Sequence, residues 1–446
     1  MTLSNTLIGD AYTSTITWDI LEELTDIGNR MAGQHGEQRG ASFLANTFSE
    51  HGLREVETNE FTVPGWWRDS SSLSVSSDPV LKYDDPHEVI ALAGSPSATI
   101  TEKLVDVGCG LPEDFESLDV SDRLVLVSSK TPNNYGRWVH RTEKYALAVE
   151  AGASGFLFYN EIPGCLPLTG NIGNDGPGTI PAVGLSREVG HKLVSACERN
   201  SPETTLEVVA QNAESTSQNV EAVIGPKTEE EILLTAHVDA HDIADGATDN
   251  GVGCALVAEI GRLLSQVEND LDTAVRFVIF GAEEIGLRGS HEWTASHDME
   301  RVKCIVNIDG NGVWEDVTMY THGFEELKDA FHDHNGILPS MLEIDSGYLP
   351  HSDHWPFVQR GVPGAMIRSE SKTGRGWGHT HADTLDKLDH EPLCRLVVVV
   401  TFGILSLADR TVEIDHASPS EVRDDLIENG HAPGLKAGGS WPFDEE

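Results

Sequence analysis

The sequence has few basic residues for its length. Its 446 residues include 30 Lys and Arg against 73 Asp and Glu, a formal net charge of -43. Such a chain repels phosphate backbones and anionic lipid surfaces, which argues against nucleic acid and membranes as partners. A surplus of carboxylates this large is typical of proteins that work in concentrated salt, where screening shortens the range of self-repulsion. We therefore expect a halophilic protein, with an ordinary acidic cytosolic enzyme as the alternative.

Paired cysteines and long apolar runs are also missing. The six cysteines are widely separated, with no C-x-x-C pair, which predicts buried free thiols rather than a disulfide framework. The longest apolar run, residues 396–408, is too short to cross a bilayer and predicts a core helix. The sequence opens without the basic and apolar segments of a signal peptide, so a cytoplasmic location is expected. Homo-oligomer formation stays open.

The length of the sequence and the change in its pattern of strands, helices and loops predict more than one domain. From residue 218 onward, continuous apolar strands alternate with helices, which is typical of a doubly wound, mostly parallel α/β sheet covered on both faces. Residues 90–212 have shorter strands and a Gly/Asn/Pro-rich loop, which predicts a small separate α/β module. We expect a discontinuous main domain (1–89 and 213–411), an insert (90–212) and an acidic tail or extension (412–446).

Acidic and imidazole side chains follow three of the predicted strands. The strand EILLTA is followed by His237 and Asp239, AVRFVIFGA by Glu283 and Glu284, and KCIVNI by Asp309. Ligands of open α/β sheets bind at the carboxyl ends of the strands, so we expect these side chains to converge at one edge. Convergence from three separate strands is a stronger signal than any single motif.

The first segment, H-V-D-A-H-D-I-A-D-G-A-T-D-N-G, begins at His237. A neutral imidazole nitrogen is a good zinc ligand. Asp239 points the same way in extended backbone and could accept the other ring N–H, which would fix the ring of His237. Asp249 alone would be interpreted as a helix cap. In this setting its two carboxylate oxygens could instead bridge two metal ions.

The adjacent Glu283 and Glu284 repel each other unless a cation or a proton compensates. Neighbouring side chains diverge, so we expect Glu284 to bind metal and Glu283 to act as the general base toward the attacking water. Asp309 is a further candidate ligand, although an Asp at a strand end can simply begin a turn. In the later segment G-H-T-H-A-D-T, either His379 or His381 could bind metal, and the spacing does not choose between them.

Together these candidates form a mixed nitrogen and oxygen donor set, which suits zinc, with manganese or cobalt as substitutes. Two such ions, about 3.5–4 Å apart, can activate a water molecule and polarise a carbonyl together. The sequence has no G-x-S-x-G motif, no P-loop and no dinucleotide-binding fingerprint. Water activated by metal is therefore the predicted mechanism.

These motifs resemble the co-catalytic zinc aminopeptidases, the family that includes aminopeptidase Y and has glutamate carboxypeptidase among its relatives. The resemblance covers most of residues 218–390, in the family's order, through AHVDAHDIADGATDNGVG, RFVIFGAEEIGLRGS, CIVNIDG, SDHWPFVQRGVPGAMI and HTHADTLDK. Residues 90–212 resemble a protease-associated domain through DRLVLVSS, KYALAVEAGASGFLFYN and TIPAVGLS. The resemblance implies a peptidase domain with an inserted protease-associated domain.

The resemblance also implies a role for each candidate residue. It places His237 and Asp309 on one ion, Glu284 and His379 on the other, and Asp249 as the bridge between them. It makes Glu283 the base and Asp239 the residue that orients His237, and it implies a cis peptide bond between Asp249 and Asn250. Several family members have a tyrosine where this sequence has Gly378; its role would pass to Tyr348, Ser352, Asp353 or His354.

We therefore expect a zinc-dependent aminopeptidase that releases N-terminal residues from peptide substrates with two Zn²⁺ ions. A carboxypeptidase or dipeptidase with the same metals is an alternative, in which Arg368 or Arg375 could bind a C-terminal carboxylate. A non-catalytic scaffold like the transferrin receptor would have lost ligands, whereas all five ligand positions and the base are present here. A glutaminyl cyclase, with one zinc on a similar fold, would usually lack the insert.

Overall fold

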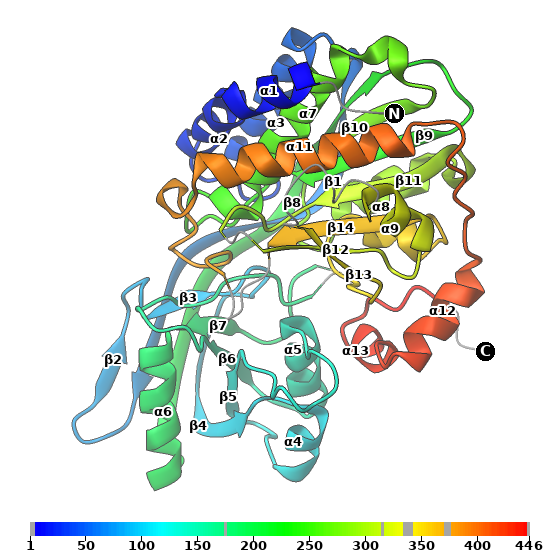
Figure 1. Cartoon of the computed structure of the whole chain (residues 1–446). Helices are drawn as coiled ribbons and strands as arrows, with labels where there is room; N and C mark the ends of the chain where they lie inside the picture. The colour runs from blue at the N-terminus through cyan, green and yellow to red at the C-terminus, as the bar shows by residue number, and fades with distance from the viewer. Residues whose placement is uncertain (1–4, 174–175, 314–315, 333–341, 370–375, 444–446) are drawn as a thin grey trace. The chain divides into compact units, whose positions relative to one another are not determined.

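The computed structural model describes residues 5–173, 176–313, 316–332, 342–369 and 376–443 (Figure 1). The chain forms two compact units, each assembled from three stretches of sequence. The first unit comprises Met1–Val63, Thr216–Gly378 and Asp383–Asp425. The second unit comprises Pro64–Ser215, His379–Ala382 and Leu426–Glu446.

The first unit is built on a mostly parallel sheet with strand order β13-β12-β14-β11-β9-β10-β8. The central strand β9 pairs in parallel with both β10 and β11, while the pairs β12–β14 and β8–β10 are antiparallel. The strands are β8 (Glu203–Ile224), β9 (Glu231–His237), β10 (Ala274–Phe280), β11 (Val302–Ile308), β12 (Val317–Tyr320), β13 (Leu342–Asp345) and β14 (Gly364–Ser369).

Helices cover both faces of this sheet because alternate strand residues point to opposite sides. On one face, Phe277 of β10 meets Phe48 of α3 (His35–Glu50), with ring centroids 6.1 Å apart. On the other face, Phe280 packs in one cluster with Trp293 of α8 (Arg288–Ser296) and Phe357 of α10 (Trp355–Val358). This arrangement confirms the predicted doubly wound α/β fold.

The remaining helices of the first unit include the long α11 (His390–Leu407). By length and composition α11 could cross a membrane, but 67% of its residues are buried inside the fold, as predicted for a core helix. It packs against α1 and α7 (Figure 1). The other elements are α1 (Asn5–Thr13), α2 (Ile16–Asp26), η1 (Ala247–Gly251), α7 (Val252–Ser265), η2 (Glu268–Asp270), η3 (Met299–Arg301), α9 (Glu325–His332), η4 (Leu385–Lys387) and α12 (Pro419–Glu428).

The second unit contains the predicted insert, with strand order β8-β4-β5-β6-β7-β3. Its core packs the central strands against α5, where Tyr145 meets Phe156 edge-on at 5.6 Å. The strands are β1 (Arg54–Val75), β2 (Leu81–Tyr83), β3 (Val89–Ala91), β4 (Ala98–Gly108), β5 (Leu124–Ser128), β6 (Gly155–Tyr159) and β7 (Ala182–Leu185). The helices are α4 (Pro112–Ser117), α5 (Arg141–Glu150), α6 (Arg187–Arg199) and α13 (Ala432–Ala437).

Two further observations bear on the sequence predictions. All six cysteines are free thiols, as predicted, but only Cys254, Cys304 and Cys394 are buried, and Cys165 is exposed. Residues 412–446 contain α12 and α13, and their Val422, Leu426 and Leu435 are buried. Part of this segment therefore contributes packed apolar side chains.

Candidate metal centre

Three neighbouring parallel strands deliver the candidate ligands to one edge of the sheet. His237 is the last residue of β9, and it lies in register with Phe280, the last residue of β10. Asp309 follows directly on β11, and Glu283 and Glu284 belong to the turn after β10. The carboxyl ends of the strands thus place imidazole and carboxylate groups together, as predicted for an open α/β sheet.

His237 is completely buried and directs its Nε2 atom at two carboxylates. This atom lies 3.4 Å from Oδ1 of Asp249 and 3.4 Å from Oδ1 of Asp309. It makes no hydrogen bond with any residue that the structure describes. Atoms bound at about 2.0–2.1 Å to a tetrahedral zinc ion lie about 3.3–3.4 Å from one another. The two distances from Nε2 of His237 therefore fit ligands of a shared zinc ion.

Asp239 fixes the other side of the His237 ring. Nδ1 of His237 lies 3.1 Å from the backbone oxygen of Asp239 and 3.5 Å from its carboxylate oxygen Oδ1. The same carboxylate accepts the backbone N–H groups of Glu283 and Glu284, each at 3.0 Å. Asp239 thus links the imidazole to the glutamate turn, and this second contact was not foreseen from the sequence.

Glu37, a residue that sequence analysis missed, holds the start of the same turn. Its carboxylate is fully buried and accepts the backbone N–H of Ala282 at 2.9 Å and the hydroxyl of Ser217 at 2.7 Å. Ala282 has a left-handed φ of 56°, a conformation that costs a non-glycine residue about 1–3 kcal/mol. Buried carboxylates therefore hold three consecutive N–H groups, those of Ala282, Glu283 and Glu284.

Arg30, also missed, supports the loop that follows His237. Its buried guanidinium donates to the carbonyls of Val238 at 2.9 Å, Asp245 at 2.8 Å and Gly246 at 2.9 Å. The carbonyl of Arg30 in turn accepts the N–H of Ala240 at 3.1 Å. A buried cation whose donors all find carbonyl acceptors stabilises an otherwise irregular loop. The two ends of this loop are thereby fixed.

Asp249 lies in η1, and its peptide bond with Asn250 is cis, which confirms the expectation drawn from the resemblance. Asp383 accepts the N–H of Asp249 at 3.2 Å and both the N–H and the hydroxyl of Thr248 at 2.7 Å. A Cβ atom at Gly378 would lie 3.1 Å from Oδ2 of Asp249. Any larger residue at Gly378 would therefore require the Asp249 carboxylate to move.

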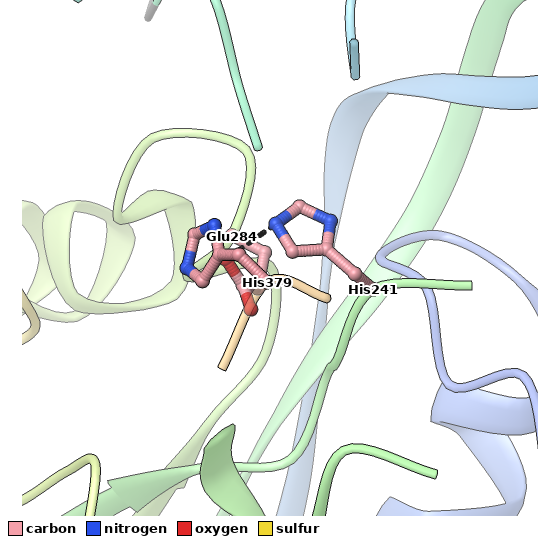
Figure 2. Close-up of side chains that lie close together, drawn as sticks. All are labelled: His241, Glu284 and His379. Atoms are coloured by element: carbon pink, nitrogen blue, oxygen red, sulfur yellow. Dashed lines mark ion pairs between the residues drawn. The ribbon is translucent and has the colours of Figure 1, made fainter. Parts of the chain in front are cut away.

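Figure 2 shows a second group of potential ligands, formed by His241, Glu284 and His379. Ligand atoms of the three side chains all lie within 4.8 Å of one another. The dashed line in Figure 2 marks the ion pair between Nε2 of His241 and Oε2 of Glu284, which lie 2.9 Å apart. His237, Glu283 and Asp309 form the other such group. His241 was not predicted, although its place in H-V-D-A-H could have suggested it.

His379 and His381, which spacing alone could not separate, have different surroundings. His379 belongs to the second group of ligands and has a left-handed φ of 61°. His381 directs Nε2 at the carbonyl of Pro86, at 3.0 Å, and its ring lies against His87. Gly378 and Asp383, which flank this short segment, both contact Asp249 as described above.

The closely spaced carboxylates of the site favour the binding of cations. Burial raises the pKa of Glu283, and the nearby Glu284 and Asp309 raise it further, while His237 opposes the rise. Burial alone would lower the pKa of His237, but the surrounding carboxylates together hold it well above its usual value; these are Glu283, Asp309, Asp239 and Asp249. Closely spaced buried carboxylates are stable as anions only when positive charge compensates them. Two divalent ions would supply that charge.

Tyr348, His354 and Asp353 have hydrogen-bond partners outside the two ligand groups, although the charge of Asp353 acts on Glu283. Tyr348 donates its hydroxyl to Asp425 at 3.1 Å, and His354 lies 3.0 Å from His322 through their Nε2 atoms. Asp353 is completely buried and accepts the hydroxyl of Ser290 at 2.6 Å. Arg368 lies on β14, and Arg375 falls outside the described residues.

Comparisons with known proteins agree with this geometry. Residues 219–401 match peptidase family M28, and residues 100–193 match the PA domain. Aminopeptidase YwaD of Bacillus subtilis is 28% identical over 85% of this chain and 81% of its own length. Leucine aminopeptidase 2 of Trichophyton rubrum is 27% identical over 75% of this chain and 67% of its own.

Solved structures give the same result. An aminopeptidase from Aneurinibacillus sp. strain AM-1 is 26% identical, with a TM-score of 0.69 over 93% of this chain and 97% of its own. BSAP, a zinc aminopeptidase from Bacillus subtilis, is also 26% identical, with a TM-score of 0.69 over 93% and 99% of the two chains. The chain belongs to peptidase family M28 and carries a PA domain inserted within its peptidase domain.

Proposed function

We propose that the protein is an aminopeptidase that uses two metal ions, normally zinc, to release N-terminal residues from peptides. The observation that carries this proposal is the presence of two groups of ligand atoms at one strand edge, each compact enough to hold an ion. Each group contains one of the two adjacent residues Glu283 and Glu284. The relatives described above are named aminopeptidases, which supports cleavage at the N-terminus.

The geometry supports a division of the ligands between the two ions. His237 and Asp309 would hold the first ion, and Glu284 and His379 the second. Asp249 would bridge them, because its Oδ1 faces His237 whereas its Oδ2 faces Gly378, the residue before His379. When bound, the two ions would polarise the peptide carbonyl and lower the pKa of a water molecule.

Glu283 is the proposed general base. Its carboxylate lies in one group with ligand atoms of His237 and Asp309, so it would lie beside a water molecule bound to the first ion. The carboxylate of Asp239 accepts the backbone N–H of Glu283, which fixes the position of the Glu283 backbone. Glu283 would accept the proton of the attacking water and deliver it to the leaving amine. The same negative charge would attract the α-ammonium group of the substrate.

The products of a short peptide test this proposal directly. Zinc-loaded protein is incubated with Leu-Gly-Gly in molar salt, and the products are identified by mass spectrometry. An aminopeptidase yields leucine and Gly-Gly, whereas a carboxypeptidase yields Leu-Gly and glycine. The variant Glu283→Gln, loaded with the same metal, is the control for contaminating peptidases. Release of Leu-Gly and glycine by the wild type alone would refute N-terminal cleavage.

A further inference from the structure

We propose that His241 is an additional ligand of the metal ion held by Glu284 and His379, which gives that ion a second imidazole. The inference rests on the proposed metallopeptidase function and deepens it. The five ligands implied by the family resemblance do not include His241. The proposal comes from its position in this structure, where it lies beside Glu284 (Figure 2).

The His241 side chain is buried and faces the metal centre. Its side chain is 4% exposed, as is that of Glu284, and Nε2 of His241 lies 2.9 Å from Oε2 of Glu284. In the absence of an ion this is the distance of an ion pair, and ligand atoms on one tetrahedral zinc ion would lie about 3.3–3.4 Å apart. A small separation of the two side chains would therefore allow them to share an ion.

The convergence of three side chains favours a shared ion over a simple ion pair. An ion pair requires only His241 and Glu284, yet His379 brings a second imidazole within 4.8 Å of both. Two imidazoles around one carboxylate form the nitrogen and oxygen donor set that zinc prefers. Removing a carboxylate and two imidazoles from water is also costly unless each finds a strong partner, and a divalent ion serves all three.

The backbone around His241 is fixed independently of its contact with Glu284. Arg30 accepts the N–H of Ala240 and donates to the carbonyls of Val238 and Asp245, on both sides of His241. A Cβ atom at Gly40 of α3 would lie 2.8 Å from Cγ2 of Val238, so the helix approaches this loop closely. Arg30 and helix α3 therefore fix the backbone of this loop, so His241 would be positioned before an ion binds.

A second imidazole would make the two metal sites chemically different. The ion near His241 would have two nitrogen ligands, from His241 and His379, whereas the ion held by His237 and Asp309 would have one. Nitrogen ligands favour zinc over manganese more strongly than carboxylates do. We expect the His241 site to retain zinc when the other site exchanges it for manganese.

Metal counting on variants tests the assignment. His241→Ala and His241→Gln are compared with the wild type and with His381→Ala, a matched histidine that lies on Pro86 instead. Each protein is zinc-loaded, dialysed against a graded series of chelator concentrations and analysed for zinc per chain. Cobalt-substituted samples are compared by visible absorption, which reports the ligands around the ion. Circular dichroism checks that each variant is folded.

The expected result is two zinc ions per chain for the wild type and for His381→Ala. In the His241 variants one ion should bind at least about 10-fold more weakly, with an altered cobalt spectrum. Two ions at wild-type affinity and an unchanged cobalt spectrum in both His241 variants would overturn the proposal, leaving the two-metal function intact. A wild type that binds no zinc would overturn the metallopeptidase function, and the role of His241 with it.

A second measurement needs no variant. Anomalous diffraction from crystals of the zinc-loaded wild type locates the ions directly. Nε2 of His241 at about 2.0–2.1 Å from an ion would support ligation. A distance greater than about 3 Å, with two ions present, would show that His241 only pairs with Glu284.

Discussion

The buried carboxylate of Glu37 accepts the backbone N–H of Ala282 at 2.9 Å, although the two residues are far apart in sequence. Glu37 lies near the start of α3, and Ala282 begins the turn that carries Glu283 and Glu284. The contact joins the N-terminal helical segment to the residues proposed to act on substrate and metal. Asp239 holds the next two N–H groups of the turn, so the turn is fixed at three successive points.

Replacing Glu37 should therefore impair catalysis as well as folding. Glu37→Ala leaves the buried N–H of Ala282 and the half-buried N–H of Gly33 without their acceptor, which should cost about 1–3 kcal/mol of unfolding free energy. We also expect kcat to fall about 10- to 100-fold with KM little changed, because the base is displaced rather than the substrate. Ser217→Ala, which removes a donor to the same carboxylate but leaves the Ala282 contact, should have a much smaller effect on kcat.

Denaturant unfolding and steady-state kinetics measure both effects. A Glu37→Ala protein with normal kcat and only reduced stability would show that Glu37 is structural alone. Equal losses of kcat in the Glu37 and Ser217 variants would also contradict a role that depends on the Ala282 contact.

Glu283→Gln should separate proton transfer from metal binding. Glutamine has the same shape but cannot accept a proton, so kcat should fall by about 10²- to 10⁴-fold. Zinc content should stay near that of the wild type, because the proposed ligands are other residues. The measurement is kcat on a leucine substrate together with zinc per chain in the same sample. Near-normal kcat in a zinc-loaded variant would rule out Glu283 as the base.

Removal of metal should reduce both activity and stability. Without cations, the carboxylates around His237 repel one another in a buried setting, which the raised pKa values of Glu283 and His237 reflect. Exhaustive chelation should abolish hydrolysis and lower the melting temperature, and zinc should restore both. Calorimetry of the apo and reloaded protein checks this. Full activity after chelation, with zinc below one ion in ten chains, would contradict metal-dependent hydrolysis.

Salt should stabilise the protein. A net charge of -43 makes the folded chain repel itself, and screening weakens this repulsion. We propose that the protein is adapted to high salt, and we expect the melting temperature to rise as KCl increases from about 0.1 to 2 M. Sucrose at matched osmolality is the control, because it is excluded from the protein surface but does not screen charge. A melting temperature that is constant in KCl would contradict this proposal.

The parts of the fold and site that the sequence could predict are those marked by a pattern within a short stretch of sequence. The strands β9, β10 and β11 are continuous apolar runs, because a parallel sheet buries both of their faces. Each is followed by a polar residue at the edge where ligands bind, so His237, Glu284 and Asp309 stand out. Helix α1, in contrast, lacks a clear periodic pattern and was not anticipated.

The residues that sequence analysis missed are charged groups whose burial depends on distant segments. Glu37 lies in the polar stretch HGEQRG, which has the composition of a solvated helix, yet its side chain is completely buried. Arg30 binds carbonyls more than 200 residues away in the sequence. His241 is one of three candidate side chains in H-V-D-A-H, and its direction depends on how Arg30 holds the loop. Periodicity carries no information about such contacts.

The most direct test of the proposed aminopeptidase uses two chromogenic leucine substrates, one with a free α-amine and one N-acetylated. Both are offered to zinc-loaded protein in molar salt, before and after chelation. A metal-dependent aminopeptidase should hydrolyse the free-amine substrate alone, and chelation should stop the reaction. Equal hydrolysis of the acetylated substrate, or hydrolysis that survives chelation, would contradict the proposed function.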